Sequence, residues 1–272
     1  MPIWALHWTI TMNTMRETIR DAWKSRRVWW FTATARTRAR FARTMLGSFW
    51  LGFSNLLSIG TLAAVYGTVF KVSDFRHYVV YLGISLVIWN SLSASISSAP
   101  NLLEHNTNHL KNTNLNPFFY VLEEWSFHLQ TFFQSFFLVI LVLSFVKGQI
   151  VINLLTLGWL PLFNLLVFML WLPMVICLLG ARYRDLYQLV PIVLQLVFLL
   201  SPILYYRESL GRFGWSANWN PIYQIIGPMR EAMMYGHLEL HKVLAMLLVN
   251  LIGMVVALKL LQRERPYLPF LI

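Results

Sequence analysis

One long uncharged stretch in the second half of the chain constrains the fold most. Residues 186–206 are 21 consecutive positions without Lys, Arg, Asp or Glu. As a helix rising 1.5 Å per residue they would measure about 30 Å, about the thickness of the hydrocarbon core of a bilayer. A charged turn, Arg182-Tyr183-Arg184-Asp185, precedes the stretch, and Arg207 follows it. A soluble domain has no use for a helix that is apolar all round, so a membrane span is predicted.

The composition agrees with this prediction. The chain is 57% hydrophobic, 12% charged and 15% aromatic, which is typical of a polytopic membrane protein and not of a soluble enzyme or a disordered chain. The single cysteine, Cys177, excludes an intramolecular disulfide, and its apolar surroundings predict a packing role. The seven histidines are scattered without metal-ligand spacing, so no metal site is predicted.

Five further apolar runs complete a prediction of an all-α integral membrane protein with six transmembrane helices in one domain, residues 1–272. These runs are residues 46–70, 78–99, 118–146, 154–179 and 243–261, within a bundle at 46–262. Pro161 and Pro173 are predicted to break the fourth run. The serine-rich half of the second run fits either close helix packing or the lining of a polar path. Glu123 and Glu124, near the start of the third, suit a helix N-terminus.

Three segments outside these runs differ from them in charge and polarity. Residues 1–45 hold nine Lys and Arg against Glu17 and Asp21, with apolar residues at helical spacing from Met12. This pattern predicts an N-terminal amphipathic interface helix; a solvated basic tail is the alternative, and nucleic-acid binding is disfavoured because every later segment suits a membrane. Residues 101–117 are polar and predict a short amphipathic helix. Residues 207–242, rich in Trp and Pro, predict short re-entrant helices between spans five and six.

The distribution of positive charge predicts the orientation. With six spans and a cytoplasmic N-terminus, fifteen Lys and Arg fall on the cytoplasmic side and seven outside. The inverted arrangement would place the basic N-terminal cluster outside, against the positive-inside rule. Both termini are therefore predicted to be cytoplasmic, with the basic charge facing anionic membrane lipids.

The sequence lacks the motifs of several catalytic classes. It contains no Gly-x-x-x-x-Gly-Lys-Ser/Thr, no Gly-x-Ser-x-Gly and no His-Glu-x-x-His. Charge inside the spans is nearly absent, so no residue is an obvious carrier for an ion relay. Six spans enclose little volume, and a path for a bulky substrate would form more naturally between two copies.

Three motifs carry a resemblance to a known family. They are Gly180-Ala-Arg-Tyr-Arg-Asp-Leu186 with Val190-Pro191, Gln195 and Ser201-Pro202-Ile203-Leu204-Tyr205; Arg43-Thr-Met-Leu-Gly-Ser-Phe-Trp50; and Asn220-Pro221-Ile222-Tyr223 followed by Arg230. With these motifs the chain resembles, over almost its whole length, the permease subunit of type-2 ABC exporters of polysaccharides and polyol phosphates, which export O-antigen, capsule or teichoic acid.

The resemblance implies a transport subunit without catalytic residues, cofactor or metal of its own. It implies a homodimer in the bacterial inner (plasma) membrane, two separate ATP-binding subunits that hold ATP and Mg, and a lipid-linked glycan as substrate. Residues 104–114 would form the coupling helix that seats in the ATPase, although the family's basic x-x-F-P after it is missing here. The coupling residues would be Glu104, His105, Asn108, Leu110 and Lys111, and the family's motif turn is Arg182, Arg184 and Asp185.

Aromatic rings suit a sugar path, because sugars stack their C–H faces on rings while their hydroxyls stay solvated. The candidates are Trp50, Phe53, Trp89, Phe198, Tyr205, Tyr206, Trp215 and Trp219. Ordinary aromatic belts at the membrane surface are the alternative for each of them. Arg207 or Arg230 would meet a pyrophosphate, or else anchor the chain at the interface.

Two other functions stay open. A type-2 exporter of a drug or lipid would need no wide aromatic lining. A membrane-embedded transferase would need catalytic groups at the membrane face, where only Glu104, His105 and Glu123 come near, without a motif.

Overall fold

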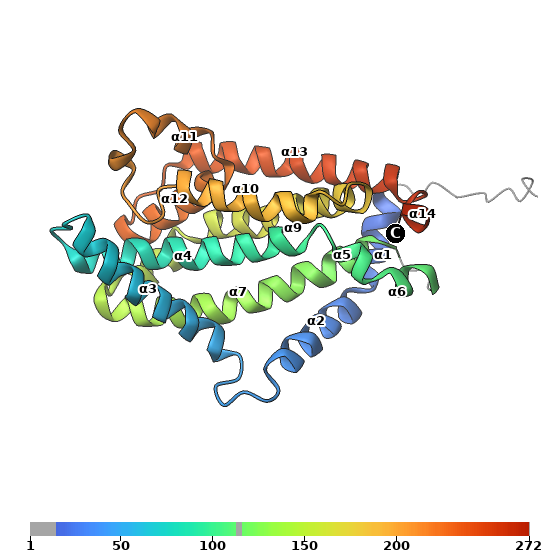
Figure 1. Ribbon diagram of the computed structural model, residues 1–272, viewed down its shortest axis with the longest axis horizontal. Coiled ribbons are helices and arrows are strands. Elements are labelled where there is room, and N and C mark those ends of the chain that lie inside the picture. The colour runs from blue at the N-terminus through green and yellow to red at the C-terminus, as the bar shows by residue number, and fades with distance from the viewer. Residues whose placement is uncertain (1–14, 113–115, 272) are drawn as a thin grey trace, which may run out of the picture.

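The computed structural model describes residues 15–112 and 116–271, and every regular element in these ranges is a helix. The long helices lie side by side in one bundle (Figure 1). Five of them are long and apolar enough to cross a membrane: α3 (Phe49–Val69), α4 (Phe75–Ser98), α7 (Phe118–Val146), α9 (Trp159–Arg182) and α13 (Leu240–Glu264). An all-helical chain with several apolar helices of spanning length is thus confirmed.

The predicted bounds of these spans agree with the structure to within about five residues, and α7 matches its prediction at both ends. The predicted breaks in the fourth span are wrong. Pro173 lies inside the continuous helix α9, and Pro161 is its third residue, where a missing N–H costs little because that group has no partner within the helix.

The fifth predicted span, residues 186–206, is shorter than expected. Helix α10 (Leu186–Leu200) has 15 residues and ends before Ser201-Pro202, so a 21-residue helix to Tyr206 is not observed. Proline disfavours the helical conformation in the residue before it, and Ser201 is accordingly extended at φ −91°, ψ 132°. Six spanning helices are therefore not confirmed: five have the length and α10 does not.

The turn that follows α10, residues 201–206, is held by side chains from other helices. The Tyr78 hydroxyl donates to the Leu204 carbonyl (2.5 Å), and the Tyr81 hydroxyl lies 2.8 Å from the Pro202 carbonyl and 2.9 Å from that of Tyr205. Backbone that leaves a helix inside a membrane is tolerated when protein groups satisfy it. These tyrosines make the early end of α10 compatible with burial.

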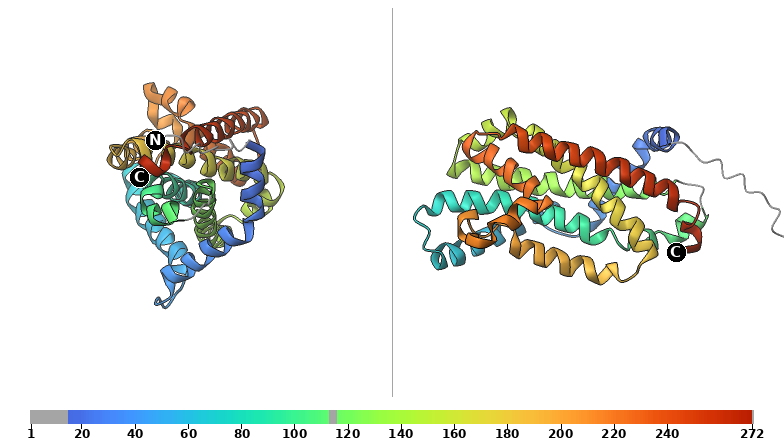
Figure 2. Two further views of the ribbon diagram at one scale, coloured as in Figure 1. Left: turned by 90° about the vertical axis from the view of Figure 1, so that its right-hand side faces the viewer. Right: turned by 90° about the horizontal axis from the view of Figure 1, so that it is seen from above.

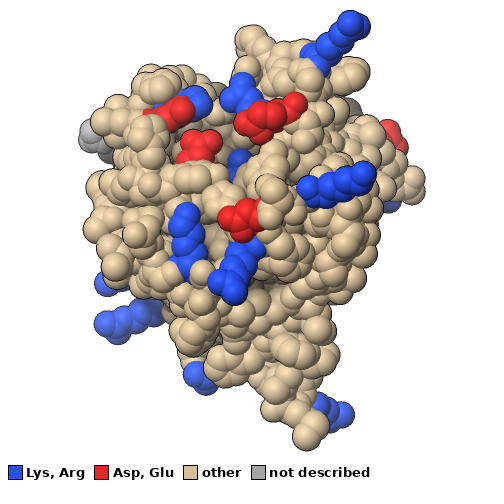
Figure 3. Space-filling view, turned by 90° about the vertical axis from the view of Figure 1, so that its left-hand side faces the viewer, with Lys and Arg blue, Asp and Glu red and all other residues tan. Residues whose placement is uncertain are grey.

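Short helices gather at the two ends of the bundle (Figure 1). One end, here called the α5/α6 end, carries α1 (Met15–Lys24), α5 (Leu102–His105), α6 (Thr107–Asn112) and α14 (Leu268–Leu271). The opposite end, called the α11/α12 end, carries η2 (Arg207–Phe213), α11 (Gly214–Trp219) and α12 (Pro221–Tyr235), and α8 (Gln149–Thr156) follows α7 there. Figure 3 shows basic and acidic side chains interspersed on the α11/α12 end.

The sequence explains where α12 begins. Asn220 accepts hydrogen bonds from the backbone N–H groups of Ile222 (3.0 Å) and Tyr223 (3.3 Å), and Pro221 occupies the first helical position. Residues 207–242 thus contain short helices as expected. Their position relative to a membrane stays a prediction.

The N-terminal segment forms two helices, α1 and α2 (Arg26–Phe41), with a break at Ser25. They run along the outside of the bundle (Figure 2). Trp23, Trp30 and Phe31 are exposed, while Trp29 is buried and its indole N–H donates to the Ala22 carbonyl at 3.0 Å. The amphipathic pattern from Met15 onward forms helix as predicted, whereas Met12 lies outside the described residues.

Helix α4 is the centre of the core. Of its apolar stretch, 72% is buried, against 17% for α3. The largest fully buried side chains of this core include Tyr78 of α4 itself, Phe132 of α7 and Phe168 of α9. The weak burial of α3 leaves one whole face of a spanning helix without cover from this chain.

A buried amide cluster joins α9 to α13. The Asn250 amide donates to the Asn164 backbone carbonyl (3.1 Å) and to its side-chain oxygen (3.0 Å), and the Trp171 indole N–H donates to the Asn250 side-chain oxygen (2.9 Å). Both asparagines are almost fully buried. Such bonds hold helices together where lipid offers no alternative partner.

We expect Asn250→Leu to lower the free energy of unfolding by about 2 kcal/mol, because three interhelical bonds disappear and Asn164 and Trp171 lose partners. Thermal unfolding in detergent measures this. Gln188→Leu is the control, since Gln188 is exposed on α10 and its side chain makes no hydrogen bond with the described part of the chain. Equal midpoints for the two variants would contradict the structural role of the cluster.

Candidate functional site

The open face of α3 presents two predicted aromatic residues close together. Trp50 and Phe53 are 48% and 41% exposed, and their ring centroids lie 5.6 Å apart. Hydroxyl groups of Ser54 and Ser58 share the exposed side of the helix, each bonded to a carbonyl one turn earlier. This face therefore combines rings and hydroxyls on one side of a helix long enough to cross a membrane.

A chain of amides crosses from α3 to its neighbours a turn further along. The Asn90 amide donates to the Asn55 side-chain oxygen (2.6 Å), and the Asn55 amide donates to the Ser135 hydroxyl (2.6 Å). Asn90 itself is exposed. An exposed carboxamide within a spanning helix is costly against lipid, so this position favours contact with water, with a polar solute or with another protein surface.

The rings continue toward the α11/α12 end. Trp89 of α4 lies 5.2 Å from Phe198 of α10, and Phe70, just past α3, lies 6.5 Å from Tyr205. Tyr66 stacks on Phe70 at 5.7 Å. We call the set from Trp50 to Tyr205 the aromatic column. Trp89 is buried at 6% exposure, so this predicted path residue packs in the core beneath the column's surface. The column comprises Trp50, Phe53, Tyr66 and Phe70 at α3, Trp89 of α4, Phe198 and Tyr205 at α10, and the amides of Asn55 and Asn90.

Arg230 and Tyr206 occupy the interior beside the column. Arg230 is only 4% exposed; it donates to the Ser85 hydroxyl (3.0 Å) and the Pro202 carbonyl (3.0 Å) and sits 3.9 Å over the Tyr81 ring. Tyr206 packs 4.7 Å from Tyr81. In this arrangement Arg230 holds the turn after α10, and a phosphate contact of Arg230 stays a prediction.

The remaining predicted path residues lie apart from the column. Trp215 and Trp219 are 62% and 82% exposed on α11. Arg207 is exposed and donates to the Asn218 side-chain oxygen at 2.6 Å. An exposed guanidinium at this end can donate further N–H groups to an anion. A pyrophosphate contact of Arg207 stays a prediction.

At the α5/α6 end the motif turn meets the predicted coupling segment. The Arg184 guanidinium lies 3.5 Å from the Glu104 carboxylate, although the residues are far apart in sequence. Arg182 lies 3.6 Å from Glu264 at the end of α13. Asp185 precedes α10 but makes no side-chain cap bond. The turn thus ties α5, α9, α10 and α13 together at one place.

The predicted coupling residues are divided between solvent and core. Glu104, His105 and Asn108 are exposed, while Leu110 is half-buried and packs against the core cluster at this end. The side chain of Lys111 lies outside the described part of the structure. A partner that seats on this end would therefore meet a polar surface carried on α5, which packs onto α7 and α9, and on α6, which packs onto α5.

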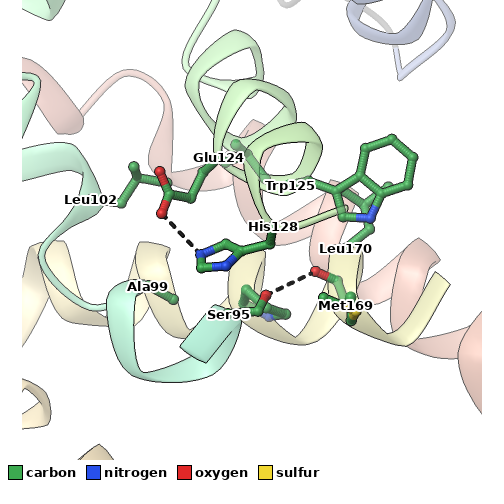
Figure 4. Close-up of a pocket in the computed structure, with 10 residues that line it drawn as sticks. Ser95, Ala99, Leu102, Glu124, Trp125, His128, Met169 and Leu170 are labelled. Atoms are coloured by element: carbon green, nitrogen blue, oxygen red, sulfur yellow. Dashed lines mark hydrogen bonds and ion pairs between the residues drawn. The ribbon is translucent and has the colours of Figure 1, made fainter. Parts of the chain in front are cut away.

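A charged cluster that the sequence analysis missed connects α2 to the bundle. The Arg36 guanidinium bonds Glu124 (2.5 Å) and Glu123 (3.2 Å), and it lies 4.0 Å from the Phe127 ring centroid. Glu124 also bonds His128 (3.0 Å). Figure 4 shows the Glu124 carboxylate and the His128 ring facing each other from α7, with Ser95 of α4 near by.

This cluster borders a cavity of only about 10 Å³, which admits at most about one water molecule. His128 lies 2.9 Å from the Ser98 hydroxyl, so the cluster reaches the last turn of α4. The sequence suggested only that Glu123 and Glu124 suit a helix N-terminus. In the structure they also join α7 to α2 through Arg36. The i, i+4 spacing of Glu124 and His128 was the signal for that pair, but nothing in the sequence pointed to Arg36.

The serine-rich part of α4 bonds mainly within the protein. Ser91 donates to the Val87 carbonyl (2.9 Å), and Ser95 lies 3.5 Å from the Met169 carbonyl. These contacts agree with the packing alternative for most of the segment, whereas Asn90 at its start faces outward. Within the described ranges, no three His, Cys, Asp or Glu side chains come together in a way that would hold a metal ion.

Comparison with known proteins gives two matches. The sequence profile of the ABC-2 type transporter family matches residues 30–234, which is more than half of the chain. The O-antigen export system permease protein RfbA of Klebsiella pneumoniae is 25% identical over 239 residues, covering 83% of this chain and 87% of that protein. The matched range contains the whole aromatic column and the charged cluster of α2 and α7.

Proposed function

This chain belongs to the ABC-2 type transporter family, and from that membership we propose that it is the transmembrane subunit of an exporter of a lipid-linked polysaccharide. The similarity to an O-antigen export permease supports a glycan as the substrate. Family membership implies an ATP-binding partner subunit. ATP and Mg would bind to that partner, and this chain would supply the path and the coupling surface.

The observation that carries the proposal is the aromatic column beside exposed Asn90. The exposed rings of Trp50 and Phe53 on α3 suit the C–H faces of sugars, and the amides of Asn55 and Asn90 suit their hydroxyls. The path would open between two copies that face each other along α3 and α10. A second copy would also cover part of the exposed face of α3, of whose apolar stretch this chain buries only 17%.

The α5/α6 end would receive the ATP-binding subunit on the cytoplasmic side of the bacterial inner membrane, with both termini on that side. Movement there would pass to α10 through the Arg184–Glu104 pair and to α7 through Arg36 and Glu124. Closure of the ATP-binding subunits would then separate the two copies along α3 and α10. The glycan would thread outward past the column.

Reconstitution tests the proposal directly. The chain and its ATP-binding subunit are placed together in proteoliposomes, and export of a lipid-linked glycan is measured with ATP hydrolysis. We expect export only with both subunits and ATP. Transport of lipids that lack a glycan, at equal efficiency, would instead favour a lipid or drug exporter, and glycosyl transfer by the chain alone would favour a transferase.

We expect Trp50→Ala and Tyr205→Ala to reduce glycan export at least about five-fold while ATP hydrolysis persists. Each change removes a ring on which a sugar can stack, and the stacking of a nucleobase on an aromatic side chain, a comparable contact, contributes about 1–3 kcal/mol to binding. Phe145→Ala is the matched control, since Phe145 is 85% exposed on α7 and no ring among the described residues contacts it. Unchanged export in both column variants would count against an aromatic path.

A further inference from the structure

An open cavity of about 520 Å³ lies at the α11/α12 end, a volume within the range of small-molecule sites, about 300–1,000 Å³. The segment between α3 and α4 forms one wall and the turn after α10 forms the other. Its lining residues are Phe70, Lys71, Val72, Ser73, Asp74, His77, Tyr78, Tyr205, Tyr206 and Ser209. Figure 3 shows the mixed charges on the end of the bundle at which this cavity opens.

Several polar groups that line this cavity have no hydrogen-bond partner among the described residues. In the described ranges, no hydrogen bond or ion pair engages the Lys71 ammonium, the Tyr206 hydroxyl, or the hydroxyls of Ser73 and Ser209. Asp74 uses one carboxylate oxygen to accept from the His77 backbone N–H at 3.0 Å, which caps α4. Its second oxygen remains available. The walls thus offer donors and acceptors around one hollow.

The aromatic side chains of the cavity are fixed. The Tyr205 hydroxyl donates to the Leu199 carbonyl at 2.5 Å, and its ring meets Phe70. The Tyr206 ring lies 4.7 Å from Tyr81 and 6.0 Å from Tyr78. Rings held in this way lose little conformational freedom when a ligand stacks on them.

We propose that this cavity binds one sugar ring of the exported glycan as it leaves the aromatic column. This inference rests on the proposed function and names a site for that substrate. The ring would stack on Tyr205 or Tyr206, its neighbouring hydroxyls would donate to the free Asp74 oxygen, and Lys71 and Ser73 would donate to ring substituents.

The charges and the shape favour a sugar over other ligands. Lys71 and Asp74 offset each other, so the cavity has no excess of positive charge to select a phosphate. An acyl chain would leave the ammonium, the carboxylate and three hydroxyls without partners, which is costly. A sugar ring can place its apolar face on the tyrosine rings and its hydroxyls against the polar groups that line the cavity.

Site-directed labelling tests the site in the complete complex, in lipid nanodiscs. Cys177 is the single cysteine and is fully buried, so Ser209→Cys adds one accessible thiol beside the cavity. The rate of reaction with a membrane-impermeant maleimide is measured with glucose, galactose, mannose or their disaccharides, with glycerol as a polyol control, and with inorganic phosphate. We expect at least one sugar to slow labelling in a saturable manner, with glycerol and phosphate having little effect.

Two variants locate the binding groups. Asp74→Asn removes the charge but keeps a good helix cap, and Tyr206→Phe removes a hydroxyl but keeps the ring. We expect the sugar concentration that gives half protection to rise on the order of ten-fold for Asp74→Asn, because a bond to a charged group is lost. Glu231→Gln, on α12 outside the cavity lining, removes a charge at the same end and should leave protection unchanged.

Three outcomes overturn the inference: no protection by any sugar, protection by glycerol equal to that by sugars, or stronger protection by phosphate. If sugars fail to protect while the complex exports glycan, the site is wrong and the proposed function stands. If a sugar protects but no glycan is exported, the site stands and the proposed function fails.

Discussion

Replacement of Gly180 by alanine is expected to disrupt the α5/α6 end of the protein. A Cβ atom on Gly180 would lie 2.2 Å from the Pro100 carbonyl oxygen and 2.6 Å from its Cα. Both are backbone atoms, so no side chain can swing aside. The chain must shift α9 away from the turn between α4 and α5, which also separates Arg184 from Glu104.

Overpacking of a tight contact usually costs about 1–3 kcal/mol, and a backbone clash belongs at or above the upper end of that range. We therefore expect a loss of about 3 kcal/mol or more in the free energy of unfolding. Thermal unfolding in detergent and the yield of folded protein measure it. ATP-driven export by any Gly180→Ala protein that does fold should also be strongly reduced, because α5 and the motif turn move apart.

Gly148→Ala provides the matched control. Gly148 has an ordinary helical backbone (φ −58°, ψ −24°), and a Cβ there would meet nothing within 4 Å. It should unfold at the wild-type temperature. If Gly180→Ala behaves like Gly148→Ala, the close approach of α9 to Pro100 does not exist in the protein.

Removal of the Arg36 charge is the second change with a large expected effect. Arg36→Met leaves the mostly buried Glu124 carboxylate with His128 as its remaining partner in the structure. Breaking a buried ion pair typically costs about 3–5 kcal/mol. Because the Arg36 side chain is 41% exposed, water offsets part of this, and we expect a loss of about 2–3 kcal/mol.

The same change should loosen α2 from α7, because Arg36 also lies over the Phe127 ring. We expect faster amide hydrogen exchange in α2 and glycan export that falls more than ATP hydrolysis. Arg38→Met is the control. It removes the same charge from an exposed residue of the same helix, and Arg38 makes no ion pair within residues 15–112 and 116–271.

A double-mutant cycle isolates the pair. Glu124→Gln combined with Arg36→Met should cost less than the sum of the two single changes, since the double variant leaves no buried carboxylate at position 124. Additive effects, or an Arg36→Met protein as stable as Arg38→Met, would contradict an energetic coupling of α2 to α7.

The spans could be predicted well because hydrophobic length is local information. Residues 118–146 form α7 with the bounds expected from the sequence. Residues 186–206 show the limit of that signal: apolar composition continued to Tyr206, but Pro202 ended the helix at Leu200. The carbonyl groups freed there needed Tyr78, Tyr81 and Arg230, whose approach no local pattern indicates.

The candidate site was predicted only in part for a similar reason. An aromatic path was expected from residue type, and the structure brings Trp50 to Phe53, Trp89 to Phe198 and Tyr205 to Phe70. Trp215 and Trp219 are the same residue type as Trp50, yet they lie exposed on α11, apart from the aromatic column. Which rings share a surface depends on how helices pack, which residue type does not reveal.

By itself, the sequence determined that this protein is a bundle of apolar helices with a basic N-terminal segment, because a backbone in hydrocarbon must bond within its own helix. Only the tertiary structure decided which charges and amides meet: Arg36 with Glu124, Arg184 with Glu104, Asn55 with Asn90. Such pairs join residues that are 35 or more positions apart. Their formation depends on the packing of whole helices, and that packing also shapes the cavity beside Tyr206.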